Sequence, residues 1–273
     1  MDLKLEGIVV SHLKDGIFHV ELNRPKKLNA MNWTFWLELR QVFDSLALNG
    51  DCRAIVLSAR GKGFSAGLDI MDPQNQPPHA DDAARRGLKF MTHVKPMQDA
   101  MSSVESCLKP TIVVVHGVCV GGAVDLITAA DIRLCTEDAV FCIKEAKIGL
   151  AADVGTLARL PKIVGNDSLV RELALTARDF SAQEAKGFGL VSRVLPTFES
   201  ALEDAIAVAG QIAENSPVAI VGTKQNLNYA RNHTVQDSLD YVQIWNAAML
   251  QTDDLPAAVT ASMQKTKAQF SKL

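Results

Sequence analysis

The sequence lacks the features that mark nucleic-acid-binding, membrane-spanning or exported proteins. Its 28 basic residues are outnumbered by 31 acidic ones, and the net charge of -3 offers no general attraction for a phosphate backbone. The least polar long stretch, residues 113–130, is interrupted by His116, Asp125 and several glycines, so we expect no membrane span. The N-terminus has the pattern of neither a secretory signal nor a mitochondrial presequence. We therefore expect that the protein does not bind nucleic acid and does not span a membrane.

Several common catalytic and metal-binding motifs are also missing. The five cysteines are an odd number without a CxxC pair, which is typical of reduced thiols inside a cell. No GxSxG, HExxH, GxGxxG or P-loop motif occurs, so serine-hydrolase, zinc, nicotinamide and nucleotide-hydrolysing sites have no local support. We expect no metal site, and we interpret His116 and the tryptophans Trp33, Trp36 and Trp245 as packing residues.

What the sequence does contain is the alternation of strands and helices that is typical of an α/β fold. With 273 residues, 48% of them hydrophobic and 22% charged, the chain can form one α/β core followed by a helical tail. Apolar and β-branched runs predict strands over residues 8–12, 17–22, 54–57 and 111–115. Helical periodicity predicts a helix over residues 29–47, capped by Asn29 or Asn32, and mostly helices after residue 168. The proline-containing segment 71–96 is expected to be a loop that leads into a helix.

Gly121 and Gly122 follow the strand predicted over residues 111–115, at the point where a helix must begin. Free backbone N–H groups at a helix start attract negative oxygens, and glycine lets a ligand approach the backbone closely. Tight packing of the strand against the helix is the alternative interpretation. Asp125 favours the interpretation that the glycines form a binding site for a negative oxygen, because an acid in an aliphatic run is costly to bury unless it has a partner or a use.

Two further acids, Glu145 and Asp153, lie in segments that carry little charge. The alternative for each is a helix cap or an ion-pair partner for Lys144, Lys147 or Arg159. Three acids of this kind within residues 125–153 favour a shared pocket in which pKa values are shifted. The small residues of segment 64–69 (FSAGLD) follow a predicted strand, so they are a candidate for a second N–H donor beside Gly122.

These residues lie in segments that resemble motifs of the crotonase (enoyl-CoA hydratase/isomerase) superfamily. The segments are 23–31 (NRPKKLNAM), 64–69 (FSAGLD) and 116–132 (HGVCVGGAVDLITAADI), and they occur in the family's order. The resemblance implies an α/β fold of the ClpP-like kind, with a spiral of ββα repeats over residues 1–197. It also implies a C-terminal helical region over residues 198–273 that builds homotrimers or homohexamers, which are dimers of trimers.

The chemistry that this resemblance implies is that of acyl-coenzyme A esters. It proceeds through an enolate whose oxygen is held by two backbone N–H groups, which map by position to Leu68 and Gly122. The family positions that line the substrate correspond here to Ala66, Gly67 and Gly121. Lys26 or Lys27 lies where the family usually has a cation near the phosphates, and a solvated lysine pair is the alternative. No cofactor is expected beyond the coenzyme A that the substrate carries.

The acids distinguish two reactions within the superfamily. Hydratases have glutamates at the positions of Asp125 and Glu145 and a glycine at the position of Asp153. The pattern here, together with residues 149–157, resembles the dienoyl-CoA isomerase branch, which moves the double bonds of a 3,5-dienoyl-CoA to the 2,4 positions in fatty acid β-oxidation. Enoyl-CoA hydratase is one alternative, and a catalytically silent scaffold or RNA-binding protein of the same fold is the other.

The isomerisation itself requires two acid/base groups along an extended dienolate, because a proton leaves carbon 2 and another arrives at carbon 6. We expect Asp153 to be the base at carbon 2 and Glu145 the acid at carbon 6, or the reverse. Asp125 is expected to orient or tune the pair electrostatically.

The sequence ends in Ser271, Lys272 and Leu273, a tripeptide that acts as a receptor-read peroxisomal address. We therefore expect the peroxisomal import receptor as a partner and a peroxisomal location. The alternative is a chance tripeptide on a frayed helix.

Overall fold

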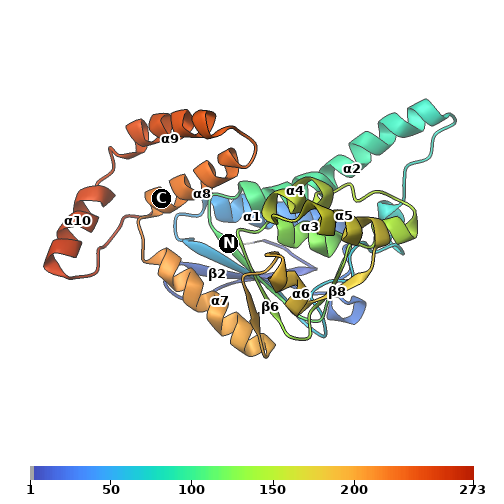
Figure 1. Ribbon diagram of the computed structural model, residues 1–273, viewed down its shortest axis with the longest axis horizontal. Helices are drawn as coiled ribbons and strands as arrows, with labels where there is room; N and C mark the ends of the chain where they lie inside the picture. The colour runs from blue at the N-terminus through green and yellow to red at the C-terminus, as the bar shows by residue number, and fades with distance from the viewer. Residues whose placement is uncertain (1–2) are drawn as a thin grey trace.

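The computed structural model describes residues 3–273, and within them the strands form two sheets (Figure 1). The larger sheet has six strands in the order β1-β2-β3-β4-β6-β9, and the smaller has three in the order β5-β7-β8. β1 is antiparallel to β2, and the remaining neighbours in the larger sheet are parallel. The strands are β1 Ile8–His12, β2 Ile17–Leu22, β3 Ala54–Ala59, β4 Thr111–Val115, β5 Val118–Val120, β6 Ile132–Thr136, β7 Val140–Cys142, β8 Asp179–Ser181 and β9 Arg193–Leu195.

Helices cover both faces of the larger sheet. The α-helices are α1 Trp33–Leu48, α2 Ala83–Ser106, α3 Gly122–Ala129, α4 Thr156–Ile163, α5 Asp167–Thr176, α6 Ala182–Gly187, α7 Phe198–Ala213, α8 Pro217–Ala230, α9 Val235–Met249 and α10 Asp254–Gln264. The short 3₁₀ helices are η1 Pro25–Lys27, η2 Pro73–Asn75 and η3 Glu145–Ile148. The main hydrophobic core joins one face of the sheet to α1, α2 and α3, and a second apolar cluster joins the other face to α7 (Figure 1).

All four predicted strands are confirmed. β1, β2 and β4 have the predicted bounds, and β3 extends to Ala59 instead of ending at residue 57. Every residue of β3 and β4 is buried, as expected for parallel strands that are covered on both faces. The alternation of strand and helix therefore builds a parallel α/β core.

The chain passes from the larger to the smaller sheet, and this brings two loops to one edge. β4 is followed by β5, and β6 is followed by β7, so each pair supplies one strand to each sheet. Val120 of β5 pairs with Cys142 of β7, and the next N–H, of Gly121, donates to the Cys142 carbonyl at 2.9 Å. Because parallel neighbours end at the same edge of a sheet, the start of α3 lies beside the residues that follow β7.

Two predicted bounds differ from the structure, namely the start of the helix predicted over residues 29–47 and the extent of the loop in segment 71–96. α1 begins at Trp33, and the side chain of Asn32 caps it by accepting a hydrogen bond from Phe35 N–H at 3.2 Å. Asn29 instead has a φ of 52°, and its side-chain amide donates to the carbonyls of Arg60 and Gly63 in the loop after β3. α2 begins at Ala83 and contains Pro96, so only the first part of segment 71–96 is a loop. Packing of α2 against α1 and α3 compensates for the hydrogen bond that the proline lacks.

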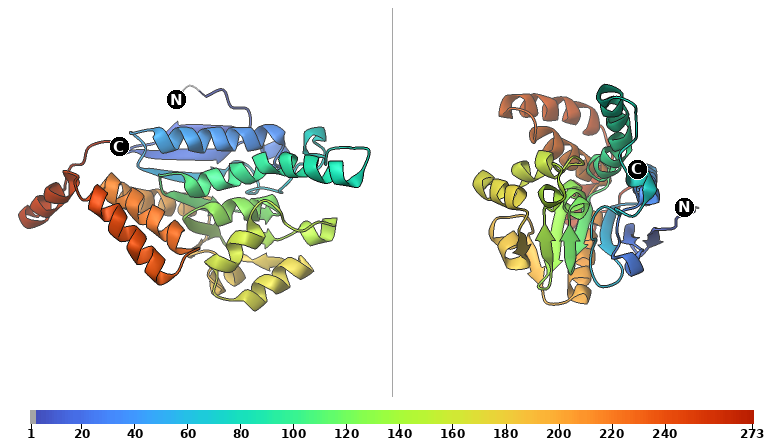
Figure 2. Two further views of the ribbon diagram at one scale, coloured as in Figure 1. Left: turned by 90° about the horizontal axis from the view of Figure 1, so that it is seen from above. Right: turned by 90° about the vertical axis from the view of Figure 1, so that its right-hand side faces the viewer.

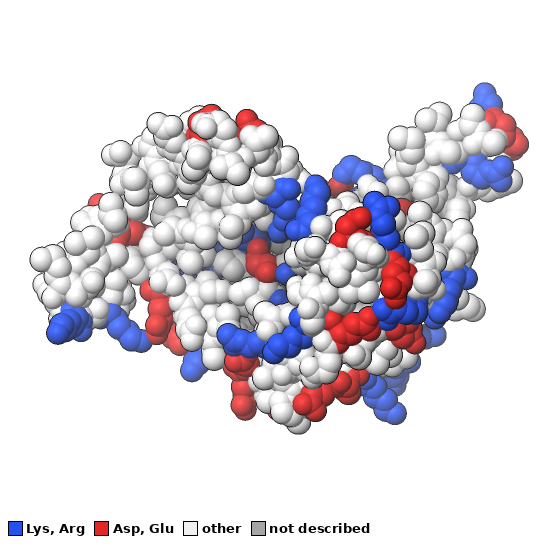
Figure 3. All heavy atoms as spheres, viewed as in Figure 1, with Lys and Arg blue, Asp and Glu red and all other residues white. Residues whose placement is uncertain are grey.

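The C-terminal helices occupy two different places. α7 packs its alanines against the larger sheet, and α8 contacts the core through the buried Lys224, which donates to the Lys109 carbonyl and to Asp131. α9 and α10 extend beyond the core to one side (Figures 1 and 2). α9 and α10 expose large apolar side chains, among them Ile244 at 73% and Met263 at 82%. Figure 3 shows a largely uncharged surface over α9, whereas charges of both signs alternate over the core. The predicted division at residue 198 coincides with the first residue of α7 and stays a prediction. Among the described residues, none of the helices combines the length and the hydrophobicity that crossing a bilayer requires.

Candidate active site

The three acids that stood out in the sequence come together near the start of α3. Asp125 lies in the first turn of α3 and is 0% exposed, while Glu145 opens η3 after β7 and is 8% exposed. Asp153 is half-buried in the loop before α4. The charges of Asp125 and Asp153 both raise the pKa of Glu145. The three acids are therefore near enough to affect one another's ionisation, while their sharing of one pocket stays a prediction.

Asp125 is held by the N-terminus of α4. Its Oδ1 accepts a hydrogen bond from the N–H of Thr156, the first residue of that helix, where the helix dipole favours negative charge. Its Oδ2 is buried and has no partner among the described residues. Burial raises the pKa of Asp125 to about 6, although the bonds from Thr156 act in the opposite direction.

Glu145 faces the glycines at the start of α3. A Cβ atom on Gly121 would lie 3.2 Å from Glu145 Oε1, so a larger residue there would press on the carboxylate. Glu145 Oε2 is buried and has no partner among residues 3–273. Burial first, and then the charge of Asp125, raise the pKa of Glu145 to about 7. A carboxyl group with such a pKa can accept or donate a proton at neutral pH.

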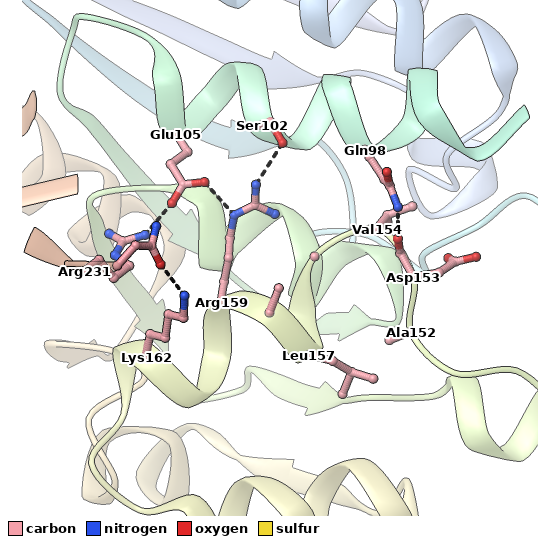
Figure 4. Close-up of a pocket in the computed structure, with 13 residues that line it drawn as sticks. Gln98, Ser102, Glu105, Ala152, Asp153, Val154, Leu157, Arg159, Lys162 and Arg231 are labelled. Carbon is pink, nitrogen blue, oxygen red and sulfur yellow. Dashed lines mark hydrogen bonds and ion pairs between the residues drawn. The ribbon is translucent and has the colours of Figure 1, made fainter. Parts of the chain in front are cut away.

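Asp153 is positioned through its backbone. The side-chain amide of Gln98, on α2, donates to the Asp153 carbonyl at 2.7 Å (Figure 4). The Asp153 carboxylate points away from Arg159, and burial raises its pKa (Figure 4). A cavity of about 370 Å³ lies beside this loop and extends toward Arg159 and Arg231. Sequence reasoning missed Gln98, because nothing in a helical pattern marks a glutamine that reaches a distant carbonyl.

Within residues 3–273 the ion-pair alternative for these acids is wrong, because none of the three bases forms a salt bridge with them and Arg159 pairs elsewhere. Arg159 Nε donates to Glu105 Oε2 at 2.9 Å, and Arg159 Nη2 donates to Ser102 Oγ at 3.0 Å. Within residues 3–273, neither Lys144 nor Lys147 forms a salt bridge with any of the three acids. In the described part of the chain, Asp125, Glu145 and Asp153 therefore form no salt bridge, and the nearby charge of Arg159 only partly offsets the rise in the pKa of Asp125.

The backbone N–H groups of Leu68 and Gly122 lie close to each other, and Gly122 directly follows the glycine that Glu145 faces. A Cβ atom on Gly122 would lie 4.0 Å from Leu68 N, and one on Gly67 would lie 3.3 Å from Gly122 N. Within residues 3–273 neither Leu68 N–H nor Gly122 N–H donates a hydrogen bond, and Gly122 is the first residue of α3. Two free donors side by side, one of them at a helix N-terminus, form an arrangement that can hold a negative oxygen.

The other predicted substrate-binding residues surround these donors. Gly67 and Gly121 are buried beside them, and both have a positive φ, of 83° and 55°, that glycine adopts without strain. Ala66 is exposed. Lys26 and Lys27 are exposed on η1, and neither forms an ion pair within the described part of the chain. Of the packing residues, Trp36 is buried, and His116 bonds the Gly61 carbonyl at 3.0 Å.

A family model described as enoyl-CoA hydratase/isomerase matches residues 12–272. The chain belongs to this family. It is 48% identical over 277 residues to a mitochondrial delta(3,5)-delta(2,4)-dienoyl-CoA isomerase of Homo sapiens, an alignment that covers 100% of this chain and 84% of the human one. A peroxisomal delta(3,5)-delta(2,4)-dienoyl-CoA isomerase of Arabidopsis thaliana is 44% identical over 270 residues, with 97% and 96% covered.

The solved structure of an enoyl-CoA hydratase from Bacillus anthracis matches with a TM-score of 0.88 at 25% identity. The match covers 97% of this chain and 99% of that one. The predicted crotonase fold is therefore confirmed.

Proposed function

We propose that the protein is a delta(3,5)-delta(2,4)-dienoyl-CoA isomerase that acts in fatty acid β-oxidation. The observation that carries the proposal is the third carboxylate, Asp153, which is half-buried and close enough to Glu145 to raise its pKa. A hydratase needs acids only around carbons 2 and 3 of its substrate, whereas the isomerisation needs them along a chain that reaches carbon 6. The names of the human and Arabidopsis relatives support the same reaction.

The reaction consists of two proton transfers that leave the composition of the substrate unchanged. One carboxylate takes the proton from carbon 2, and the electrons of that C–H bond form a dienolate. The N–H groups of Leu68 and Gly122 hold the negative thioester oxygen. The other carboxyl group delivers a proton to carbon 6, and the electrons return from the oxygen to leave the 2,4-diene conjugated with the thioester. Glu145, whose pKa is about 7, suits either part.

Asp125 acts on this pair without supplying the proton itself. Its position is fixed by Thr156, and its buried charge disfavours the ionised form of Glu145. Asp125 therefore keeps the pKa of Glu145 near neutral pH, where proton uptake and release both proceed readily.

Substrate binding and assembly follow the same family pattern. We assign the exposed Lys26 and Lys27 to the phosphates of coenzyme A, and the backbones of Ala66, Gly67 and Gly121 to the acyl thioester. The apolar side chains that α9 and α10 expose support assembly into a homotrimer or a dimer of trimers.

We further propose a peroxisomal location through the import receptor. The signal would be the tripeptide Ser271, Lys272 and Leu273, whose three residues are exposed. The peroxisomal description of the Arabidopsis relative supports this location, while the human relative is described as mitochondrial.

The substitutions Glu145→Gln and Asp153→Asn test the function. Ultraviolet absorbance follows the reaction, because a 3,5-dienoyl-CoA gains conjugation as it becomes the 2,4-dienoyl product, whereas hydration of a 2-enoyl-CoA removes conjugation. We expect wild-type protein to isomerise and each variant to lose about 100-fold or more in kcat. The exposed acid Asp167, replaced in Asp167→Asn, is the matched control and should leave kcat unchanged.

Near-wild-type turnover in both variants would contradict the carboxylate assignment. Hydration without isomerisation by the wild-type protein would identify a hydratase, and the absence of both activities would indicate a silent scaffold.

A further inference from the structure

One buried side chain outside the three acids and the two N–H donors is bound to both segments that hold Leu68. Asn75, the last residue of η2, is 6% exposed. Its Nδ2 donates to the carbonyls of Met31 and Asp69, both at 2.9 Å, and its Oδ1 accepts from Trp36 Nε1 at 3.1 Å. An asparagine amide that makes three bonds to buried groups is fixed in orientation.

The backbone that Asn75 binds is the backbone that carries the Leu68 N–H. Met31 and Leu68 form an isolated bridge, in which Met31 N–H donates to Gly67 O at 2.8 Å and Asp69 N–H donates to Met31 O at 3.0 Å. The residues on both sides of Leu68 are thus tied to Met31. Asn75 links the two segments a second time, because its one amide group donates to the Met31 carbonyl and to the carbonyl of Asp69, the residue after Leu68.

The same network reaches the second donor. A Cβ atom on Gly122 would lie 3.1 Å from Met31 Sδ and 3.8 Å from the outer ring of Trp36, so these side chains pack against the start of α3. Trp36 in turn donates to Asn75. A change at Asn75 therefore affects the residues that contact both N–H donors, although Asn75 itself touches neither donor.

We propose that Asn75 is a positioning residue that sets the direction of the Leu68 N–H toward the thioester oxygen. The proposal rests on the proposed function, in which Leu68 and Gly122 bind that oxygen. Only a side chain with two N–H donors and one acceptor can satisfy Met31, Asp69 and Trp36 together, which explains the asparagine. Its own place is set by the turn before it, since Asp72 accepts from Trp33 N–H at 2.7 Å and Asn75 N–H donates to Asp72 O at 3.1 Å.

The test combines kinetics with the infrared spectrum of a bound thioester. 2,4-Dienoyl-CoA labelled with carbon-13 at its carbonyl is bound to the wild-type protein and to Asn75→Leu, and the carbonyl stretching frequency is measured. Two aligned donors lower this frequency relative to the free ester. In Asn75→Leu we expect at least half of that lowering to disappear, kcat to fall about 10- to 100-fold, and KM to stay within about threefold.

Two further variants separate positioning from folding. Gln74→Ala, an exposed neighbour in the same turn, is the matched control and should behave as wild type in both measurements. Asn75→Asp keeps the shape of the side chain and the acceptor for Trp36 but loses both N–H donors. It should show the same losses, and it serves as the test if Asn75→Leu does not fold.

The proposal is overturned if the folded variant, Asn75→Leu or Asn75→Asp, keeps the wild-type carbonyl frequency and a kcat within threefold of wild type. Equal losses in Gln74→Ala would overturn it as well. If the wild-type protein does not isomerise, the proposed function fails separately, and the frequency of the bound ester still decides the role of Asn75.

Discussion

Burial of Glu145 destabilises the folded protein at neutral pH, and Glu145→Gln should remove that destabilisation. The pKa of Glu145 rises from 4.5 to about 7 on folding. Each pH unit of that rise corresponds to about 1.4 kcal/mol, so ionisation of this side chain makes the folded state about 3 kcal/mol less stable. Below pH 4.5 the side chain is protonated in both the folded and the unfolded state, so it does not lower the free energy of unfolding. That free energy then falls as the pH rises through about 7, where the folded state also loses the proton.

The assay is denaturant unfolding of wild type and Glu145→Gln at one protein concentration, between about pH 5 and pH 8. Most of the loss of wild-type stability falls in this range. The free energy of unfolding of the variant minus that of the wild type should therefore increase by about 2 kcal/mol between about pH 5 and pH 8. A fixed cost of burying the glutamine amide would shift the difference equally at every pH. Glu203→Gln, at an exposed position on α7, is the control and should give a constant difference.

A difference for Glu145→Gln that is constant or shrinks with rising pH would refute the reasoning. It would mean that the carboxylate is solvated or has a cationic partner in the folded protein, and the chemistry assigned to a pKa near 7 would lose its basis.

Two substitutions test the surroundings of Glu145, and a double substitution tests the coenzyme A contact. Asp125→Asn removes a charge that raises the pKa of Glu145, so the limb of the pH–rate profile that reports Glu145 should move to lower pH, and an unmoved limb would contradict the coupling. Gly121→Ala places a methyl group 3.2 Å from Glu145 Oε1 on a backbone with a φ of 55°, so we expect about 1 to 3 kcal/mol of destabilisation and about tenfold lower kcat, checked by thermal unfolding and turnover. Replacing Lys26 and Lys27 together by alanine should raise KM severalfold at an unchanged kcat, with a smaller effect at high salt, and an unchanged KM would exclude the phosphate contact.

Much of the framework could be predicted because it depends on local patterns. The bounds of β1 and β2 follow from two short apolar and β-branched runs on either side of a turn, and β4 is recognisable as a continuous β-branched run. Asp125, Glu145 and Asp153 could be singled out because carboxylates among apolar or small neighbours are rare. Their catalytic roles stay predictions.

The remainder depends on contacts between distant segments. α2 begins within segment 71–96 and continues through Pro96, because its packing against α1 and α3 outweighs the missing hydrogen bond. Asn75 lies in a proline-containing loop where asparagine is common, and only the folded chain brings Met31 and Asp69 within its reach. Gln98 is one polar residue on a long helix, and its bond to Asp153 spans 55 positions.

The central claim, that two separate carboxyl groups move the protons, is tested most directly by hydrogen exchange in heavy water. Wild type, Glu145→Gln and Asp153→Asn are incubated with a 3,5-dienoyl-CoA, and deuterium at carbon 2 and carbon 6 is measured by nuclear magnetic resonance. We predict that one variant exchanges the carbon 2 hydrogen without forming the 2,4-dienoyl product, because it keeps the base and lacks the acid, and that the other does neither. Equal exchange at carbon 2 in both variants, or normal product formation in either, would contradict the account.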